Sequence, residues 1–299
     1  MIIYEKAYAK INLSLDIVGR RPNGYHDVRM IMQTLDLSDG LSFESNDDIE
    51  GVTLVTDSEV LNEEQSGGSD NLIIKALKLL KEETGKDFNV KITLSKNIPI
   101  AAGLAGGSAD AAATLRGLNR LFSLGLTNDE LRELAVKIGA DVPFCIEGGL
   151  CLSEGIGEEL TTLTPLASVP TVICKPNIFV STKDVYNAFD SDANEKKHPD
   201  VDGMLSAIKE YDVAKVTELL ENILEPVTKA MHPVIGEIEE KLVSLNANKA
   251  IMSGSGPTVY ALFNSEKEAE TAADMLKSIY PVFEIHATKF RNVKKEHFE

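Results

Sequence analysis

The segment Asn97-Ile-Pro-Ile-Ala-Ala-Gly-Leu-Ala-Gly-Gly-Ser-Ala-Asp110 is built almost entirely from glycine, alanine and other small residues. Its glycines let the backbone bend tightly and approach a ligand closely. We expect an alanine-rich helix to follow from Ser108 to Leu124, with Gly125 ending it. The N–H groups and positive dipole end of this helix would face the loop, which favours a phosphate ligand. A flexible connection followed by a closely packed helix is equally compatible with these residues.

Two well-known phosphate-binding motifs are excluded by spacing. A Walker A loop closes with Gly-Lys-Ser/Thr, whereas Gly106-Gly107 is followed by Ser108-Ala109. The dinucleotide-binding motif G-x-G-x-x-G needs a third glycine three residues after the second. Gly155-Ile156-Gly157 has Leu160 at that position, and Gly254-Ser255-Gly256 has Val259. The loop is therefore of another kind.

The flanking sequence predicts a sheet and further helices. Side-chain alternation predicts strands over 2–18 and 28–37, separated by the turn residues Arg21-Pro-Asn-Gly24. Ser69-Asp70-Asn71 predicts an N-cap for a helix that ends at Gly85, and Thr127 to Glu130 has the spacing of a capping box. Further strands are expected at 88–94, 150–152 and 171–174, with a helix from 128 to about 139.

The last third of the chain mixes helices and strands. A polar, charged stretch over 187–201 contains Pro199 and predicts a surface connection. The expected helices are 202–209, 212–222, 234–245 and 266–279, and the expected strands are 249–252, 257–263 and 282–289. This order predicts an α+β fold with a second α+β unit.

Composition and charge exclude several classes of protein. The 299 residues are 43% hydrophobic and 26% charged, as in ordinary globular proteins. A chain of this length is typical of a protein with about two domains. Thirty basic against 47 acidic residues leave a net charge of −17. Such a charge disfavours nucleic-acid and membrane-surface binding, so an anionic ligand needs a local positive site.

Cysteine usage and the N-terminal residues indicate the compartment. Cys145, Cys151 and Cys174 are widely spaced with no CxxC pair, so we expect reduced thiols rather than a zinc site. Glu5 and Lys6 interrupt the start of the chain before an apolar signal region forms. We therefore expect a cytoplasmic protein with neither a nucleic-acid nor a membrane partner.

Three further segments are candidates for chemistry. Ser253-Gly-Ser-Gly-Pro257-Thr258 offers backbone donors, although for the segment taken alone a tight turn is the favoured explanation. Asp141 follows a helix terminator in Gly139-Ala-Asp-Val-Pro143, where an Asx-turn is the common alternative. Lys10 and Asn12 share one face of an apolar strand, where a lysine is either a surface charge or a partner for phosphate or carboxylate.

In order and spacing, these segments resemble the GHMP kinase superfamily. The Pro99 to Ala109 segment resembles its phosphate loop, and the Ser253 to Pro257 segment its third motif. Arg21-Pro-Asn-Gly-Tyr-His26 and the Asp141 segment resemble a branch that phosphorylates a cytidine diphosphate-linked methylerythritol with ATP, in the non-mevalonate route to isoprenoid precursors. The resemblance implies a two-lobe GHMP kinase fold, with an ATP-binding domain at 1–160 and a ferredoxin-like domain at 161–299 meeting at a cleft.

The resemblance also implies roles for individual residues. Asp141 matches the catalytic aspartate and Lys10 the catalytic lysine, where Lys10 would keep Asp141 ionised while the acceptor hydroxyl loses its proton. Tyr25 and His26 match the residues that receive cytosine, and Tyr186 is the candidate for a second stacking wall. Asn12 and Thr182 match positions near the acceptor.

On the nucleotide side, the implied ATP-binding residues are those of the loop and its surroundings. Mg²⁺ is expected with ATP, held by phosphates, water and Ser108. The expected partner is a small-molecule acceptor. The protein itself is expected to be a monomer or a homodimer. A different GHMP small-molecule kinase, or a catalytically silent nucleotide-binding sensor, remains the alternative. The residues implied for ATP are Asn71, Lys96, Pro99, Gly103, Leu104, Ala105, Gly106, Gly107, Ser108 and Asp110.

Overall fold

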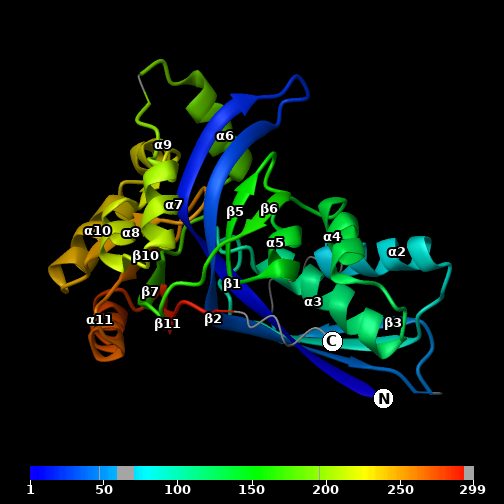
Figure 1. The fold of residues 1–299 in the computed structure, drawn as a ribbon. Helices are drawn as coiled ribbons and strands as arrows, with labels where there is room; N and C mark the ends of the chain where they lie inside the picture. The colour runs from blue at the N-terminus through cyan, green and yellow to red at the C-terminus, as the bar shows by residue number, and fades with distance from the viewer. Residues whose placement is uncertain (47, 59–70, 195, 293–299) are drawn as a thin grey trace. The chain divides into compact units, whose positions relative to one another are not determined.

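The computed structural model describes residues 1–46, 48–58, 71–194 and 196–292 and confirms the α+β class (Figure 1). The chain forms two compact units. The first unit contains Met1–Ala9, Leu37–Ile100 and Ala105–Glu147, and the second contains Lys10–Asp36, Ala101–Leu104 and Gly148–Glu299. The expected boundary near residue 160 stays a prediction.

The first unit packs helices against one end of a sheet. Strands β1 (Ile2–Arg20) and β2 (His26–Glu44) contribute to it, in the order β3-β4-β2-β1. Strand β4 pairs antiparallel with β2, with Gly40 opposite Ser95, and parallel with β3. Apolar side chains from the sheet and from the helices form its core. The other elements of this unit are β3 (Val52–Thr56), β4 (Val90–Ser95), α2 (Leu72–Thr84), α3 (Gly106–Leu121), α4 (Asn128–Val136) and α5 (Val142–Glu147).

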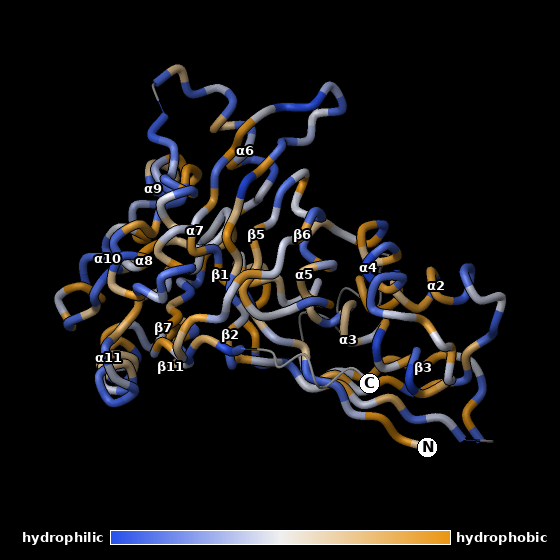
Figure 2. Tube along the Cα trace, viewed as in Figure 1, coloured by the Kyte–Doolittle hydropathy of each residue, from blue (hydrophilic) through white to orange (hydrophobic). Residues whose placement is uncertain are grey.

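The second unit contains a four-stranded antiparallel sheet of order β11-β7-β10-β9. Helix α10 (Val234–Ser244) packs on β9 and β10, and α11 (Glu266–Ile279) packs on β7 and β11. In Figure 2, α11 alternates between polar and apolar residues, as a helix with one buried face requires. The strands of this sheet are β7 (Pro170–Lys175), β9 (Lys249–Met252), β10 (Val259–Leu262) and β11 (Glu284–Lys289).

Shorter elements complete the second unit. Strand β5 pairs with β2 and β6, and β8 pairs parallel with β1 at Ser14 and Leu15. These elements are β5 (Leu150–Glu154), β6 (Glu159–Thr162), α6 (Thr182–Ser191), α7 (Val201–Lys209), α8 (Val213–Glu218), β8 (Glu221–Asn222) and α9 (Glu225–Met231).

The expected caps are present where the structure describes them. The Asn71 side chain accepts a hydrogen bond from the Ile73 N–H at the start of α2, and Gly85 ends that helix at a φ of 66°. Ser69 and Asp70 lie outside the described residues. The capping box predicted at Thr127 and Glu130 opens α4.

Some elements differ from the sequence predictions. The stretch from Asn187 to Ser191 belongs to α6 instead of a surface connection, because Val185 and Phe189, four residues apart, bury one face of the helix. Helix α3 begins at Gly106, two residues earlier than expected. The helix expected over 212–222 ends at Glu218, because Glu221 and Asn222 pair with β1. None of the helices described is long and apolar enough to span a membrane.

Candidate active site

The N-terminus of α3 carries no side-chain cap. Its N-cap is Ala105, held at a φ of 57°, a left-handed conformation that costs an alanine roughly 1 kcal/mol. The first turn consists of Gly106, Gly107 and Ser108, whose N–H groups have no partner one turn earlier in the helix. By contrast, the N-cap side chains of α2 and α4 accept hydrogen bonds from their helices. The first turn of α3 can therefore bind an anion through its backbone.

Close packing explains why position 106 is glycine. A Cβ atom at Gly106 would lie 3.1 Å from Cγ2 of Ile98 and 3.4 Å from Nζ of Lys96. Any larger residue would push away the segment that leads into the loop. Pro99 follows in that segment and is buried. The start of α3 and the 96–98 segment are thus built to touch.

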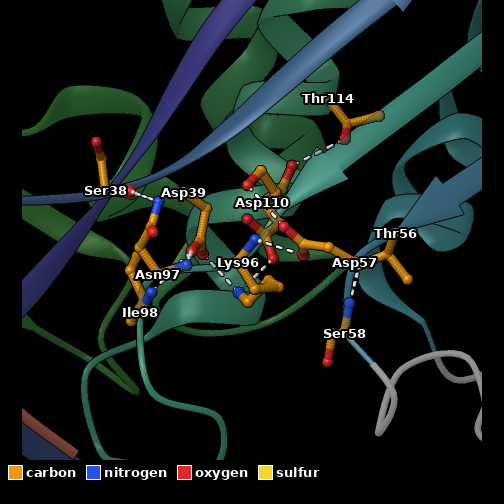
Figure 3. Close-up of polar contacts among 11 residues, drawn as sticks. Ser38, Asp39, Thr56, Asp57, Ser58, Lys96, Asn97, Ile98, Asp110 and Thr114 are labelled. Carbon is orange, nitrogen blue, oxygen red and sulfur yellow. Dashed lines mark hydrogen bonds and ion pairs between the residues drawn. The ribbon is translucent and has the colours of Figure 1, made fainter.

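A buried cluster of charges holds this segment (Figure 3). The carboxylate of Asp39 accepts hydrogen bonds from the backbone N–H groups of Asn97, at 2.6 Å, and Ile98, at 2.8 Å. The Lys96 ammonium lies between two carboxylates, 2.5 Å from Oδ2 of Asp39 and 2.9 Å from Oδ2 of Asp110. Asp39 is fully buried and Asp110 is 3% exposed. The two aspartates therefore tie the 96–98 segment to the first turns of α3.

The cluster has one more carboxylate than it has cations. Burial raises the pKa of Asp110 to about 7, and the nearby charge of Asp39 adds to this, while Lys96 opposes it. Burial alone would lower the pKa of Lys96, but Asp110 and Asp39 outweigh it and raise that pKa. Oδ1 of Asp110 is buried and has no hydrogen-bond partner. This oxygen is therefore a buried acceptor whose hydrogen-bonding capacity is unused.

In the second unit, Gly103 packs directly against the Ser253 to Gly256 turn. Gly103 has a φ of 72°, and a Cβ there would overlap the carbonyl oxygen of Ser253. The Ser253 hydroxyl donates to the carbonyl of Gly103 at 3.0 Å. Asn222 supports the same turn by donating to the carbonyl oxygens of Met252 and Gly254. The glycine loop therefore contacts the Ser253 to Gly256 turn at Gly103.

Lys10 and Asn12 lie side by side on β1. Nζ of Lys10 donates to Oδ1 of Asn12 at 2.8 Å, and both residues are buried. The Lys10 N–H donates to the carbonyl of Leu104 at 3.1 Å, which anchors the glycine loop to the strand. The Tyr260 hydroxyl donates to the carbonyl of Asn12 at 2.9 Å. Lys10 is therefore a buried lysine rather than a surface charge.

Asp141 lies in the first unit, directly before α5. Its carbonyl accepts a hydrogen bond from the Cys145 N–H at 3.1 Å, so it occupies the start of that helix. Pro143 fits the first turn, where its missing N–H costs nothing.

The aromatic candidates of the second unit lie together. The rings of His26 and Tyr186 are 4.8 Å apart with an interplanar angle of 41°. Tyr25, next to His26, is 58% exposed, so its ring is available to a ligand. Thr182, at the start of α6, shares a 2.8 Å hydrogen bond with the hydroxyl of Ser255 in the third motif.

Comparison with known proteins places the chain in a family. Profiles of the GHMP kinases N terminal domain and of the GHMP kinases C terminal match residues 71–149 and 204–282. A 4-diphosphocytidyl-2-C-methyl-D-erythritol kinase of Lachnoclostridium phytofermentans is 49% identical over 273 residues, 91% of each chain. The chain belongs to the 4-diphosphocytidyl-2-C-methyl-D-erythritol kinase family of GHMP kinases.

Other members of this kinase family agree over the same length. The enzyme of Caldicellulosiruptor saccharolyticus is 46% identical and covers 91% of this chain and 92% of its own. A crystal structure of 4-(cytidine 5'-diphospho)-2C-methyl-D-erythritol kinase superposes with a TM-score of 0.80 at 30% identity, covering 97% of this chain and all of its own. A homoserine kinase from Cytophaga hutchinsonii, 19% identical with a TM-score of 0.74, shares the fold. As a GHMP kinase, the chain uses ATP to phosphorylate a small molecule.

Two aspartates of the site are absent from the sequence predictions. Asp39 holds Lys96, and Asp190 contacts His26 at 2.8 Å. The strand predicted from the sequence ends at residue 37, and the stretch over 187–201 is predicted as a surface connection. In the structure, Asp39 lies on β2 and Asp190 on α6, so no sequence signal pointed to either residue. Both pairs join residues far apart in the sequence.

Proposed function

We propose that the chain transfers the γ-phosphoryl group of ATP to the 2-hydroxyl of 4-diphosphocytidyl-2-C-methyl-D-erythritol, in the non-mevalonate route to isoprenoid precursors. The observation that carries this proposal is the 49% identity, over 91% of the chain, to a kinase named for that substrate. The uncapped first turn of α3 supports it, because phosphate oxygens satisfy free helix N–H groups.

On the nucleotide side, we propose that the backbone N–H groups around Gly103, Gly106, Gly107 and Ser108 bind the ATP phosphates. Pro99, Leu104 and Ala105 shape the loop, while Asn71, Lys96 and Asp110 lie toward the adenosine. Lys96 is already held by two carboxylates, so we expect it to act mainly by holding the 96–98 segment in place. Oδ1 of Asp110, buried without a partner, suits a hydroxyl donor.

Mg²⁺ is compatible with the residues present. In the part of the chain that the structure describes, no three His, Cys, Asp or Glu side chains form a metal site. Mg²⁺ binds well through nucleotide phosphates and water with few protein ligands, and the Ser108 hydroxyl on the first turn of α3 is the protein ligand we propose. When bound, the ion neutralises phosphate charge.

At the acceptor, we propose that Asp141 accepts the proton of the attacking hydroxyl. Phosphoryl transfer depends mainly on positioning and charge stabilisation, so a weakly basic carboxylate suffices. Lys10 stabilises the developing negative charge on the acceptor oxygen, and its hydrogen bond to Asn12 orients its ammonium group. Asn12 and Thr182 contact the methylerythritol portion. Tyr25 and Tyr186 stack on the cytosine, whose edge His26 contacts.

We also propose that the protein is cytoplasmic, acts as a monomer or a homodimer without nucleic-acid or membrane partners, and has its domain boundary near residue 160. Sedimentation measurements distinguish the two oligomeric states. Limited proteolysis tests the boundary, because cleavage should concentrate near residue 160 if the connection there is exposed.

The reaction is tested by ADP release from ATP and Mg²⁺, comparing the cytidine-linked acceptor with buffer, mevalonate and homoserine. We expect turnover with the cytidine-linked acceptor alone. Asp141→Asn should lower kcat by roughly a hundredfold or more, with little change in nucleotide affinity. Turnover with mevalonate or homoserine instead would favour another GHMP kinase. Tight ATP binding without turnover of any acceptor would favour a nucleotide sensor.

A further inference from the structure

The side chain of His26 has a carboxylate partner that the proposed reaction leaves unassigned. Nε2 of His26 lies 2.8 Å from Oδ1 of Asp190, and the two side chains are only 8% and 21% exposed. The guanidinium of Arg20 lies 3.3 Å from the other carboxylate oxygen. All three residues belong to the second unit. This geometry is a histidine held by a carboxylate whose charge is balanced by an arginine.

The contact determines which nitrogen of the ring carries the hydrogen. A carboxylate only accepts hydrogen bonds, so Nε2 of His26 must donate to Asp190. In the neutral ring, Nδ1 then has a free lone pair and acts as an acceptor. Without Asp190, either nitrogen could carry the hydrogen, and the ring could present a donor or an acceptor at Nδ1.

Helix α6 fixes the orientation of the His26 ring as well as its tautomer. Tyr186 and Asp190 are four residues apart on α6 and therefore lie on the same face. Tyr186 packs against the His26 ring at 4.8 Å, and Asp190 binds its Nε2 atom. The two contacts together fix the direction in which Nδ1 points.

We propose that Asp190 is a positioning residue that keeps His26 in its Nε2–H tautomer, so that Nδ1 accepts a hydrogen bond from the exocyclic amine of the substrate's base. This inference rests on the proposed function, in which His26 contacts the base. Cytosine carries an amine at that position, whereas uracil carries a carbonyl oxygen. An acceptor facing an acceptor repels, so the pair selects cytidine-linked over uridine-linked ligands.

The tautomer is tested in the free protein, with no substrate present. Long-range ¹H–¹⁵N NMR of uniformly labelled protein at pH 8 reports which ring nitrogen is protonated, and the signals missing from His26→Gln identify the residue. We expect the Nε2–H form in the wild type and a shift toward the Nδ1–H form in Asp190→Asn, because the new amide can donate to Nε2. An Nδ1–H ring in the wild type would overturn the proposal.

Base selection is tested by calorimetric binding of CDP and UDP, which needs no turnover. We expect the wild-type protein to bind CDP at least roughly tenfold more tightly than UDP. A difference of this size corresponds to losing one hydrogen bond and leaving its acceptor without a donor. Asp190→Asn should lose this preference through weaker CDP binding, with ATP affinity unchanged. The matched control is Asp184→Asn, which removes the same charge from the exposed first turn of α6.

The outcomes separate the inference from the proposed function. A CDP preference that Asp184→Asn keeps and Asp190→Asn loses supports the assignment, even if no acceptor is phosphorylated. Equal CDP and UDP binding by the wild type would refute it. The proposal would also be refuted if Asp190→Asn weakened the binding of CDP and of UDP equally, because loss of a merely structural residue would give that result.

Discussion

Replacing Asp39 by asparagine should cost the first unit far more stability than replacing Asp57, its neighbour in Figure 3. Both carboxylates accept hydrogen bonds from residue Lys96, Asp39 from its ammonium and Asp57 from its backbone N–H at 3.0 Å. The difference is burial, because Asp39 is fully buried whereas Asp57 is exposed. The two variants therefore compare the same chemical change in two environments.

The structure gives the expected size of each effect. In Asp39→Asn, the amide oxygen can still accept hydrogen bonds from the backbone of the 96–98 segment. The amide NH₂ group then replaces the carboxylate oxygen that faces the Lys96 ammonium, so two donors face each other. Breaking a buried ion pair costs roughly 3–5 kcal/mol, and the remaining contact of Lys96 with Asp110 reduces this to about 3 kcal/mol. An exposed change such as Asp57→Asn costs at most about 1 kcal/mol.

The assay is urea denaturation of both variants and the wild type, followed by the KM for ATP. We expect Asp39→Asn to unfold at clearly lower urea and to raise the KM for ATP, because Gly106 packs against the 96–98 segment that Asp39 holds. Asp57→Asn should change both quantities little. Equal denaturation midpoints for the two variants would refute the argument that Asp39 is the buried anchor.

Three further outcomes follow from other contacts. Gly103→Ala should destabilise the protein by about 2 kcal/mol more than Gly125→Ala, because both have positive φ (72° and 76°) but only Gly103 would meet Ser253; equal losses would contradict this packing. Burial raises the pKa of Glu239 from 4.5 to about 7, so between these pH values the native state binds more protons than the unfolded state. The free energy of unfolding should therefore fall by up to about 3 kcal/mol as the pH rises through this range. In denaturation measured at several pH values, Glu239→Gln should flatten this dependence. Burial raises the pKa of the Cys174 thiol to about 12, so iodoacetamide at pH 8 should leave Cys174 unmodified in the native protein, as peptide mass mapping would show.

Local sequence signals were sufficient for the longer elements. Helix α11 occupies the residues predicted for it. In the structure Ser265 caps it, and Ala269, Ala272 and Leu276 are buried at helical spacing. Short elements lacked such signals. Helix α5 has six residues and β6 has four, lengths at which tertiary contacts rather than intrinsic propensity decide the conformation.

The candidate site shows the same division. Small residues, their spacing and the following helix mark the proposed phosphate loop in the sequence, since glycine and a helix start are local properties. The partners of that loop are not local: Asp39 and Lys96 are 57 residues apart in the sequence, and His26 and Asp190 are 164 apart. An isolated aspartate in a sequence is most simply explained as a surface or turn residue, so neither partner could be predicted.

The sequence by itself determined the α+β class and the kinase superfamily, and it predicts the glycine loop and the proposed catalytic pair, because each depends on residue type and spacing along the chain. Only the tertiary structure decided that Lys96 is shared by two buried carboxylates, that Gly103 touches the third motif, and that α6 holds the ring of His26. These contacts depend on which distant segments fold against one another. Burial then sets their strength, because a charge removed from water needs its partner.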